Sequence, residues 1–418
     1  MILTWCFTIP FFTHISNRGD YVIIDIPAAV RHILRVLNEH GFEAFIVGGC
    51  VRDSLLGRIP YDWDVATSAV PQEIKSCFPH TYDTGIEHGT VTVAYKGKNY
   101  EVTTYRVDGI YEDGRRPKSV SFTASLREDL ARRDFTINAM AWHPDLGLVD
   151  PFGGLNDVEN NIIRGVGDPD LRFTEDALRM MRAVRFSGQL DFDIEHETFL
   201  AVKRNASGLK RISAERIRDE LTKLLLSPHP EKILLLQESG LLSEGWPLPM
   251  GPTGDEIHNA AKILHICPKK ASLAYAVLFF NREPEHAYLA MKSMRFDNAM
   301  CRDTSLLIKW AKCAVNNQDC SVRKYLSLSG PEYFHDLMTL KQLMKTADSD
   351  LCPLLIEKYD TIIENGDCLN IASLQIDGNE LLDMGLSGKA IGETLNRLLD
   401  LVLRDPSLNS KSTLRRLV

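Results

Sequence analysis

The chain has 418 residues, of which 44% are hydrophobic, and its formal net charge is −8 at pH 7. This length predicts roughly two to four domains, and the acidic balance argues against a protein that binds polyanions over its whole surface, although 48 Lys and Arg residues leave room for local basic faces. The nine cysteines are scattered and form no CxxC pair, which indicates reduced thiols and no zinc framework. No apolar run reaches the roughly 18 residues that a membrane-spanning helix needs, so we expect a cytoplasmic protein without a membrane partner.

The first residues differ from the rest of the chain. The opening MILTWCFTIPFFTHISNRGD lacks the basic start and the cleavage pattern of a signal peptide. We therefore expect residues 1–21 to be a disordered extension and the first domain to begin near Val22.

The next 90 residues or so have the patterns of a small unit of mixed helices and strands. The apolar spacing of AAVRHILRVLNEHG predicts a helix that ends at Gly41, and the apolar stretch FEAFIVGG predicts a strand. A short helix in VRDSLLGR, a second strand in DWDVATSA and a helix opened by Pro71 follow. The alternation of HGTVTVAYKGKNYEVTTYR around KGKN indicates a β-hairpin.

Beyond this unit the pattern changes twice. Residues 106–131, RVDGIYEDGRRPKSVSFTASLREDLA, begin rich in charge, Gly and Pro and predict a loop that leads into a helix at SLREDLARR. From about residue 172 the chain is almost entirely helical in pattern. The predicted fold class is therefore α+β, with a mixed α/β head followed by a long all-α part.

Two carboxylates, Asp62 and Asp64, stand one residue apart in the predicted second strand. Residues i and i+2 of a strand point to the same face, so these two charges repel each other unless a cation lies between them. Hard oxygen ligands in this arrangement suit Mg²⁺, which also takes waters and substrate phosphates. Glu101, on the predicted hairpin, is a candidate third catalytic carboxylate. The alternative is a pair of solvated aspartates on an edge strand.

A glycine turn, GGCVRD, precedes these carboxylates. Gly48 and Gly49 allow backbone N–H groups to approach a phosphate, and the start of the following helix favours negative charge. Arg52 adds a charge-assisted hydrogen-bond donor. The turn and the carboxylates together predict a site for Mg²⁺ and a nucleoside triphosphate, whereas a lone pair of glycines would predict little.

With these motifs in place, the sequence resembles a known family. GGCVRDSLLGRIPYDWDVATSA, RRDFTINAMA, DPFGG, RFTEDALRMMRAVRF and SAERIRDEL are similar, in this order, to the motifs of the class II tRNA nucleotidyltransferases. This family contains the CCA-adding enzymes and the bacterial poly(A) polymerases. The resemblance implies a polymerase β-type nucleotidyltransferase head, a helical neck, body and tail, Mg²⁺ dependence, and template-free addition of nucleotides to a tRNA 3′ end.

The resemblance also implies a domain layout and partners. It places the catalytic head at residues 22–160, a neck that recognises the nucleotide base at 161–228, a body at 229–320 and a tRNA-binding tail at 321–418. The implied partners are CTP, ATP and tRNA, held at its acceptor end and elbow. Matched to the motifs, Gly49 and Arg52 contact the nucleotide, Asp62 and Asp64 hold the metals, Arg133 contacts the incoming nucleotide, and the base- and phosphate-reading helix carries Asp176, Arg179, Arg182 and Arg185.

The chemistry of EDALRMMRAVR supports a role in choosing the base. Its charged residues recur every three positions, and each step falls about 60° short of a full helical turn, so only adjacent members share a face. The carboxylate of Asp176 beside the guanidinium of Arg179 pairs with the amine and ring nitrogen of cytosine or adenine and mismatches uracil and guanine. A wrong base leaves buried polar groups unpaired, at a cost on the order of 1–3 kcal/mol per group. The alternative is an amphipathic helix with i,i+3 ion pairs on a solvated face.

Three further motifs have structural and functional interpretations. In RRDFTINAMAW, Arg133 reaches the triphosphate, whereas Asp134 and Asn138 equally suit a functional role or a bracing role between head and neck. DPFGG predicts a hinge or a tight turn. In SAERIRDEL, Ser213 predicts a helix N-cap, and the charges that follow mainly stabilise the neck.

The predicted activity is the addition of C, C and A to tRNA, and close alternatives share the motifs. These are an enzyme that adds only A and a poly(A) polymerase. The resemblance also implies that a flexible loop between the first two motifs accompanies addition of the terminal A and is shortened in enzymes that add only CC. The loop VDGIYEDGRRPKSV has full length, so an enzyme that adds only CC is disfavoured. The alternative from another class is a non-catalytic protein that binds RNA or nucleotides, against which the intact Asp62 and Asp64 argue.

Overall fold

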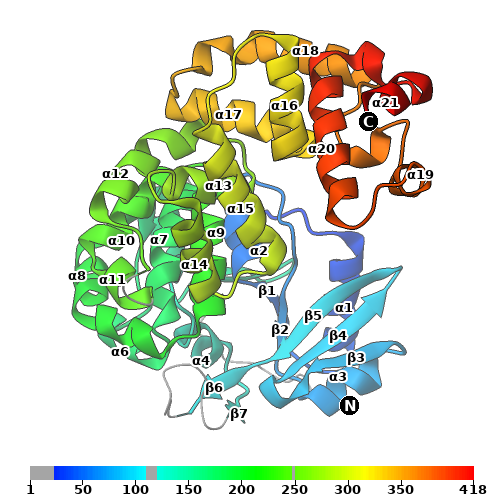
Figure 1. Cartoon of the computed structure of the whole chain (residues 1–418). Coiled ribbons are helices and arrows are strands. Elements are labelled where there is room, and N and C mark those ends of the chain that lie inside the picture. Colours follow the sequence, from blue (N-terminus) through cyan, green and yellow to red (C-terminus); the bar gives the residue numbers. More distant parts are fainter. Residues whose placement is uncertain (1–22, 110–119, 247–249) are drawn as a thin grey trace, which may run out of the picture. The chain divides into compact units, whose positions relative to one another are not determined.

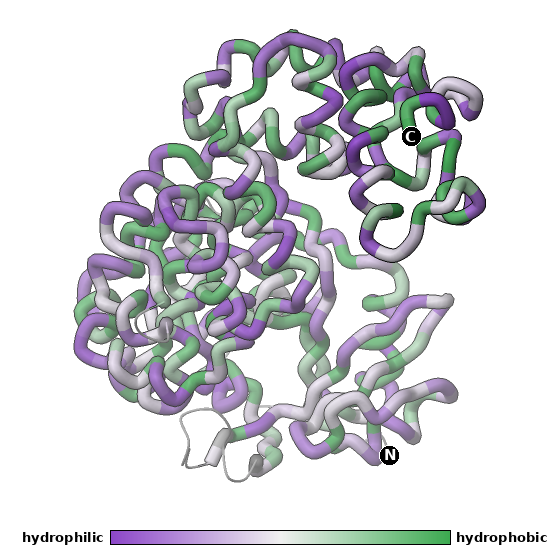
Figure 2. Tube along the Cα trace, in the orientation of Figure 1, coloured by the Kyte–Doolittle hydropathy of each residue, from purple (hydrophilic) through white to green (hydrophobic). Residues whose placement is uncertain are grey.

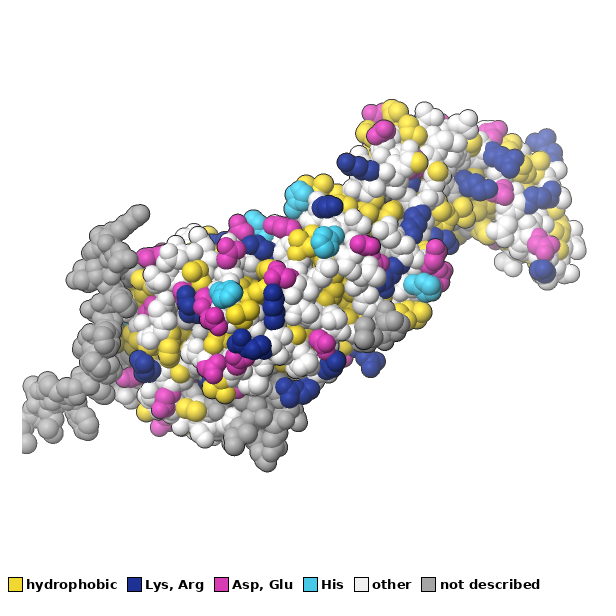
Figure 3. Space-filling view, turned by 90° about the vertical axis from the view of Figure 1, so that its left-hand side faces the viewer, with side chains coloured by type: hydrophobic (Ala, Val, Ile, Leu, Met, Phe, Trp, Pro, Cys, Tyr) yellow, Lys and Arg dark blue, Asp and Glu magenta, His cyan; other side chains and the backbone are white. Residues whose placement is uncertain are grey.

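The computed structural model describes residues 23–109, 120–246 and 250–418. The chain forms two compact units, Met1–Leu248 and Pro249–Val418. The predicted extension over residues 1–21 and the centre of the loop at 110–119 lie outside the described residues, and the four-part division of the chain stays a prediction. Side chains of both charge signs are interspersed over the face drawn in Figure 3, in line with the balanced composition. No helix within the described ranges is both long and apolar enough to cross a membrane.

The N-terminal unit is built on a mixed sheet of seven strands, which confirms the predicted head (Figure 1). The strands follow the order β3-β4-β5-β2-β1-β8-β9, and only the pair β2–β5 is parallel. Their bounds are β1 Ala44–Val47, β2 Val65–Thr67, β3 Thr81–Gly85, β4 Thr90–Tyr95, β5 Lys98–Thr104, β8 Ala141–His143 and β9 Gly147–Val149. Two small pairs complete the strands of this unit: β6 Arg106–Asp108 with β7 Val120–Phe122, and β10 Ile162–Ile163 with β11 Asp193–Ile194.

Several local predictions are confirmed. Helix α1 (Ala28–Glu39) buries Val30, Ile33, Leu34 and Leu37, the stripe that its sequence spacing predicts, and the chain turns at Gly41. Strands β4 and β5 form the predicted hairpin, in which Tyr95 pairs with Lys98 across the two-residue turn of KGKN. Figure 2 shows the corresponding alternation of hydrophobic and hydrophilic stretches along the chain.

The predicted second strand is shorter than its sequence pattern suggests. Strand β2 begins at Val65, which pairs with Ile46, so Asp62 and Asp64 lie in the segment before the strand. Val47 still donates its N–H to the carbonyl of Asp64 at 3.0 Å, and beyond this bond the chain leaves the sheet. The expectation that the strand itself aligns the two carboxylates is therefore wrong.

Helices make up the remainder of the N-terminal unit. They are α2 Gly49–Leu55, α3 Pro71–Cys77, α4 Leu126–Ala131, α5 Gly154–Glu159, α6 Pro169–Glu175, α7 Leu178–Leu190, α8 His196–Asn205, α9 Ala214–Leu225, α10 Leu234–Glu238 and α11 Leu241–Gly245. The motif EDALRMMRAVR does not form one helix, because α6 ends at Glu175 and Asp176 has an extended backbone. Helix α7 packs along α9.

Two of the weaker motifs take the predicted positions with different contacts. Ser213 occupies the N-cap position of α9, but its side chain makes no capping hydrogen bond. DPFGG forms a tight turn in which Asp150 accepts hydrogen bonds from the N–H groups of Gly154 and Leu155, at 2.8 and 2.9 Å, and so opens α5.

The C-terminal unit is helical throughout its described residues. Its helices are α12 Gly254–Ile263, α13 Ala271–Leu278, α14 Pro284–Ser293, α15 Asn298–Ala311, α16 Asp319–Ser329, α17 Phe334–Met344, α18 Cys352–Glu364, α19 Gly378–Asp383, α20 Lys389–Arg404 and α21 Lys411–Leu417. An ion pair is buried within this unit: the ammonium of Lys341 donates to Asp348 at 2.7 Å and to the carbonyl groups of Ala311 and Cys313 at 3.1 and 2.8 Å. It joins the ends of α15 and α17 to the segments that follow them.

Candidate active site

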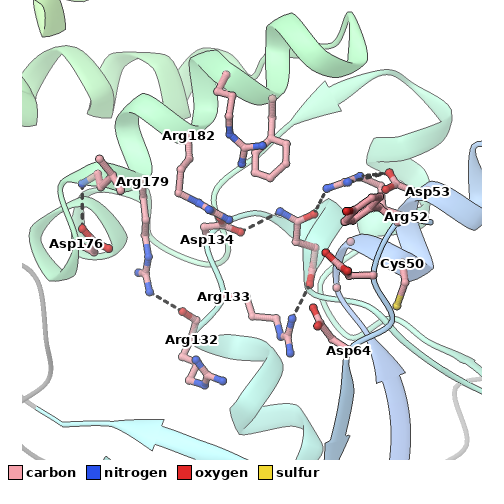
Figure 4. A pocket seen from close by; sticks show the side chains of 18 of the residues that line it. Cys50, Arg52, Asp53, Asp64, Arg132, Arg133, Asp134, Asp176, Arg179 and Arg182 are labelled. Atoms are coloured by element: carbon pink, nitrogen blue, oxygen red, sulfur yellow. Dashed lines mark hydrogen bonds and ion pairs between the residues drawn. The ribbon is translucent and has the colours of Figure 1, made fainter. Parts of the chain in front are cut away.

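A cavity of about 620 Å³ in the N-terminal unit collects the predicted site residues (Figure 4). Its walls come from the turn between β1 and α2, the segment before β2, the segment between α4 and β8, and helices α7 and α9. Every predicted site residue except Glu101 lines this cavity. The full lining is Gly48, Gly49, Cys50, Arg52, Asp53, Tyr61, Asp62, Asp64, Arg132, Arg133, Asp134, Asn138, Asp176, Leu178, Arg179, Arg182, Arg185, Phe186 and Arg216.

The carboxylates lie on one side of this cavity. Asp62 and Asp64 both keep access to solvent, although protein groups surround the carboxylate of Asp64. This enclosure raises the pKa of Asp64, Arg133 opposes the rise, and the negative charges of Glu101 and Asp62 add to it. Glu101 is therefore close enough to act electrostatically, even though it does not line the cavity.

The donor set of this acidic side fits a hard divalent cation. The pKa of Asp64 is raised mainly by burial and less by the negative charges of Glu101 and Asp62, and a cation beside Asp62 and Asp64 would offset both effects. Mg²⁺ is commonly held by one or two carboxylates together with waters and substrate phosphates, so two protein carboxylates suffice. Across the described residues, no set of three or more His, Cys, Asp or Glu side chains converges as a metal site, so the structure does not group Glu101 with them as a third ligand.

The glycine turn makes room for an arginine. Gly48 has φ of 77° and ψ of −129°, a conformation that favours glycine, and a Cβ at this position would lie 2.8 Å from Nη1 of Arg133. Its N–H already donates to the carbonyl of Met140 at 3.1 Å. The expected role of Gly48, a free N–H for a phosphate, therefore does not match the structure. Gly49 has more room, because a Cβ added there would meet Nη2 of Arg52 at 3.6 Å, an ordinary contact.

Arg52 is held in place by neighbouring groups. Its Nε and Nη2 donate to Asp53 at 2.9 and 2.8 Å, and its Nη1 donates to the side-chain oxygen of Asn138 at 2.5 Å. The guanidinium also lies over the ring of Phe186, 5.1 Å from its centre. Arg52 is thus positioned before any ligand binds.

Arg132 and Arg133 share one buried acid. Both donate to the carboxylate of Asp129, Arg132 at 2.7 Å and Arg133 at 3.2 Å. Burial alone would raise the pKa of Asp129, but the two guanidiniums outweigh it and lower the pKa. Figure 4 shows Arg133 facing the region of Asp64, where it is well placed to meet a phosphate near the carboxylates.

Asp134 and Asn138 brace the cavity. Arg182, which extends from α7, donates to Asp134 through Nε and Nη2, both at 2.7 Å, and Asn138 donates to the same carboxylate at 3.1 Å. Burial opposes the charge of Asp134, yet Arg182 and the hydrogen bond from Asn138 lower its pKa to about 2. Because Asn138 also accepts from Arg52, these two residues link α7 to α2, which favours the bracing interpretation.

Arg185 and Arg182 share a second acid, Glu220 of α9. Arg185 approaches Glu220 at 2.5 Å and Arg182 at 4.0 Å. Burial and the neighbouring Arg182 lower the pKa of Arg185 to about 10, against the attraction of Glu220. Both guanidiniums lie over the ring of Phe186, at 5.3 Å for Arg182 and 3.7 Å for Arg185. The face of the Phe186 ring attracts both guanidiniums, which offsets part of the repulsion between Arg182 and Arg185.

Asp176 and Arg179 line the cavity from separate supports. Asp176, in the break between α6 and α7, accepts from the N–H of Leu178 at 3.0 Å and from Arg216 of α9 at 2.8 Å. Arg179 donates to Glu175 at 2.6 Å and to the carbonyl of Arg132 at 2.8 Å. The expectation of two neighbours on one helical face is therefore wrong, but both groups remain fixed beside the same space.

Sequence reasoning misses the groups that hold the arginines. It treats Arg216 and Glu220 only as charges that stabilise the neck, and it gives Asp129 and Phe186 no role. A signal is present in SAERIRDEL, because Arg216 and Glu220 are four residues apart and lie on one face of a helix. That face turns Arg216 towards Asp176, in the break before α7, and Glu220 towards Arg185 of α7.

Comparison with known proteins identifies the family to which this geometry belongs. Residues 44–164 match the family described as Poly A polymerase head domain, and residues 191–247 match the one described as Probable RNA and SrmB- binding site of polymerase A. The CCA-adding enzyme of Lactobacillus helveticus is 37% identical over 401 residues, which cover 94% of this chain and 96% of that protein. The chain belongs to the family of CCA-adding enzymes.

Two more relatives show how far the likeness extends. The CCA-adding enzyme of Geobacillus thermodenitrificans is 55% identical over 210 residues, which cover 50% of this chain and 52% of that protein. The crystal structure of the Bacillus stearothermophilus CCA-adding enzyme in complex with CTP has a TM-score of 0.79 and 31% identity, and the match covers 92% of this chain and 94% of that one. The predicted nucleotidyltransferase fold is thereby confirmed. CCA-adding enzymes are nucleotidyltransferases, which generally depend on a divalent metal ion.

Proposed function

We propose that this chain adds C, C and A from CTP and ATP to the 3′ end of tRNA in the cytoplasm, with Mg²⁺ held by Asp62 and Asp64. In each step the terminal 3′-hydroxyl forms a phosphodiester bond with the α-phosphate, and pyrophosphate leaves. The observation that carries this proposal is one cavity whose lining joins two carboxylates, Asp62 and Asp64, to a group of arginines that other residues hold in position. When bound, the ion supplies positive charge to the reacting phosphates.

Two arginines of the cavity lining suit the triphosphate. Arg52 and Arg133 are each oriented by an acid, Asp53 and Asp129, at 2.8 and 3.2 Å. A guanidinium has five N–H donors, so one ion pair leaves others to bind phosphate oxygens. Because these ion pairs restrict the two arginine side chains beforehand, less side-chain entropy is lost when the triphosphate binds. These residues hold the triphosphate so that its α-phosphorus lies next to Asp62 and Asp64.

Asp176 and Arg179 select the base within this proposal. Cytosine and adenine both present an amine beside a ring nitrogen that accepts a hydrogen bond, which pairs with a carboxylate beside a guanidinium. Arg216 and the N–H of Leu178 hold Asp176, and Glu175 and the carbonyl of Arg132 hold Arg179. Uracil and guanine present an oxygen beside a ring N–H, the reverse order, and the fixed Asp176 and Arg179 cannot exchange places to pair with it. The protein itself therefore selects the base, without a nucleic-acid template.

The first experiment supplies purified protein with Mg²⁺, tRNA that lacks CCA, and each nucleoside triphosphate alone and in pairs. Two C residues are expected with CTP alone, and one A after them when ATP is added. Extension of this tRNA by ATP alone would contradict the specificity, and no extension under any condition would contradict the activity.

The second experiment tests the acidic side with a matched control. Asp62→Asn and Asp64→Asn are expected to abolish incorporation while tRNA binding, measured by filter retention, changes less than about threefold. The control is Asp83→Asn, an exposed carboxylate of β3 that pairs with Lys75 on the surface. Full incorporation by Asp62→Asn and Asp64→Asn would refute the metal assignment. Asp176→Ala and Arg179→Ala are expected to relax the exclusion of UTP and GTP, and an unchanged nucleotide preference would refute the base-reading role.

A further inference from the structure

Two large apolar side chains, Ile59 and Tyr61, stand out by their exposure. Each is 97% exposed, whereas the next value among the large hydrophobic residues of the described ranges is 86%, for Ile23. Tyr61 also lines the catalytic cavity, directly before Asp62, and Ile59 does not. Neither the metal site nor the nucleotide site described above gives Tyr61 a role.

The segment that carries Tyr61 is fixed at both ends. After α2 and the turn at Gly57, the N–H of Arg58 donates to the carbonyl of Asp53 at 2.8 Å. At the other end, the carbonyl of Asp64 accepts from Val47 of β1 at 3.0 Å. Both anchors are backbone hydrogen bonds, and they fix the two ends of the short segment in which Tyr61 precedes Asp62.

We propose that Tyr61 is a stacking platform for the base of the terminal tRNA nucleotide, the one whose 3′-hydroxyl attacks. This inference rests on the proposed function. In that proposal Asp62 and Asp64 hold the ion at the α-phosphorus, so the attacking hydroxyl must come within reach of these two carboxylates. The nucleoside that carries the hydroxyl then lies over the residue next to Asp62, which is Tyr61.

The chemistry of stacking suits this position. In three successive steps the terminal base is the one that precedes CCA, then C, then C, so its recognition must tolerate different bases. Every base has a π face, and proteins hold unpaired single-stranded ends by stacking them on aromatic side chains without reading their edges. A Tyr side chain with an open face meets this need, whereas a hydrogen-bonding group would favour one base over another.

Steady-state kinetics with Tyr61→Ala, Tyr61→Phe and the equally exposed control Ile59→Ala test this proposal. Loss of the ring is expected to raise KM for tRNA by about 5- to 100-fold in Tyr61→Ala, since stacking on aromatic side chains has that range of effect, with KM for CTP unchanged. Tyr61→Phe and Ile59→Ala are expected to match the wild type. A rise in KM for CTP instead of tRNA, or no rise in either, would overturn the proposal.

A binding measurement separates this proposal from the proposed function. A tRNA with 2-aminopurine as its last base is titrated with protein in the absence of nucleoside triphosphates, so that no extension takes place. Stacking is expected to quench the fluorescence with the wild type and Tyr61→Phe but not with Tyr61→Ala. Quenching that is equal in all three variants would overturn the role of Tyr61 even if tRNA is extended, whereas quenching without extension by the wild type would overturn only the proposed function.

Discussion

Alanine substitutions at the two glycines of the GG turn compare a position that requires glycine, Gly48, with one that has room for a side chain, Gly49. At Gly48, alanine meets two obstacles: a backbone with φ of 77° and ψ of −129°, and Nη1 of Arg133 2.8 Å from the new Cβ. A strained backbone of this kind costs on the order of 1–3 kcal/mol. The guanidinium of Arg133 must also move, which weakens its 3.2 Å ion pair with Asp129. We expect Gly48→Ala to lower the free energy of unfolding by about 2–4 kcal/mol and the Tm by about 5–15 °C.

Gly49→Ala is the matched control in the same turn. Gly49 is the first residue of α2, its φ is not positive, and the nearest atom to an added Cβ is Nη2 of Arg52, at 3.6 Å. We expect the free energy of unfolding to change by less than about 1 kcal/mol, in either direction. If a phosphate approaches this backbone, KM for CTP and ATP nevertheless rises. Thermal unfolding and steady-state kinetics of both variants measure these effects, and equal stability of the two variants would refute the reasoning.

Three further predictions concern ion-paired charges. The pKa of Asp134 is about 2 in the folded state and about 3.9 in the unfolded state, so its charge stabilises the fold by on the order of 2 kcal/mol above pH 4. This stabilisation should be lost as the pH falls from about 4 to 2. The unfolding free energies of the wild type and Asp134→Asn, measured across this pH range, test it. Lys341→Met should lower the unfolding free energy by about 3–5 kcal/mol because it leaves Asp348 buried without its cation, whereas the exposed Lys389→Met should change it by less than about 0.5 kcal/mol in the same denaturant titration. Arg216→Ala should relax discrimination against UTP several-fold in kcat/KM while retaining CTP incorporation, and unchanged discrimination would show that Asp176 does not depend on this ion pair.

Local features of the fold could be predicted from the sequence because neighbouring residues determine them. The buried stripe of α1 and the hairpin of β4 and β5 follow from spacing and turn residues within about a dozen positions. The break at Asp176 could not be predicted this way. Its stretch has helical spacing, but the carboxylate of Asp176 forms an ion pair with Arg216, 40 residues further along the chain.

The residues of the candidate site could likewise be predicted from the sequence only in part. The motif residues that line the cavity could be identified from their chemistry, because Asp62, Asp64 and the arginines carry the charge that phosphates and metals need. Some of the residues that orient them are distant in sequence: Arg52 and Asn138 are 86 positions apart, and Arg182 and Asp134 are 48 apart. Sequence spacing contains no information on such pairs unless the fold that brings them together is known.

The acids that pair with the arginines explain how so many guanidiniums occupy one cavity before a triphosphate arrives. Asp53, Asp129, Asp134, Glu175 and Glu220 each form an ion pair with an arginine of the lining. Each acid cancels part of the repulsion and fixes one side of a guanidinium, which has five N–H donors. A positioned charge costs no reorganisation when the phosphates bind, and the same holds for Asp176, which Arg216 orients. If base selection depends on this fixed geometry, then variants of the acids that never touch a nucleotide will still lower its fidelity.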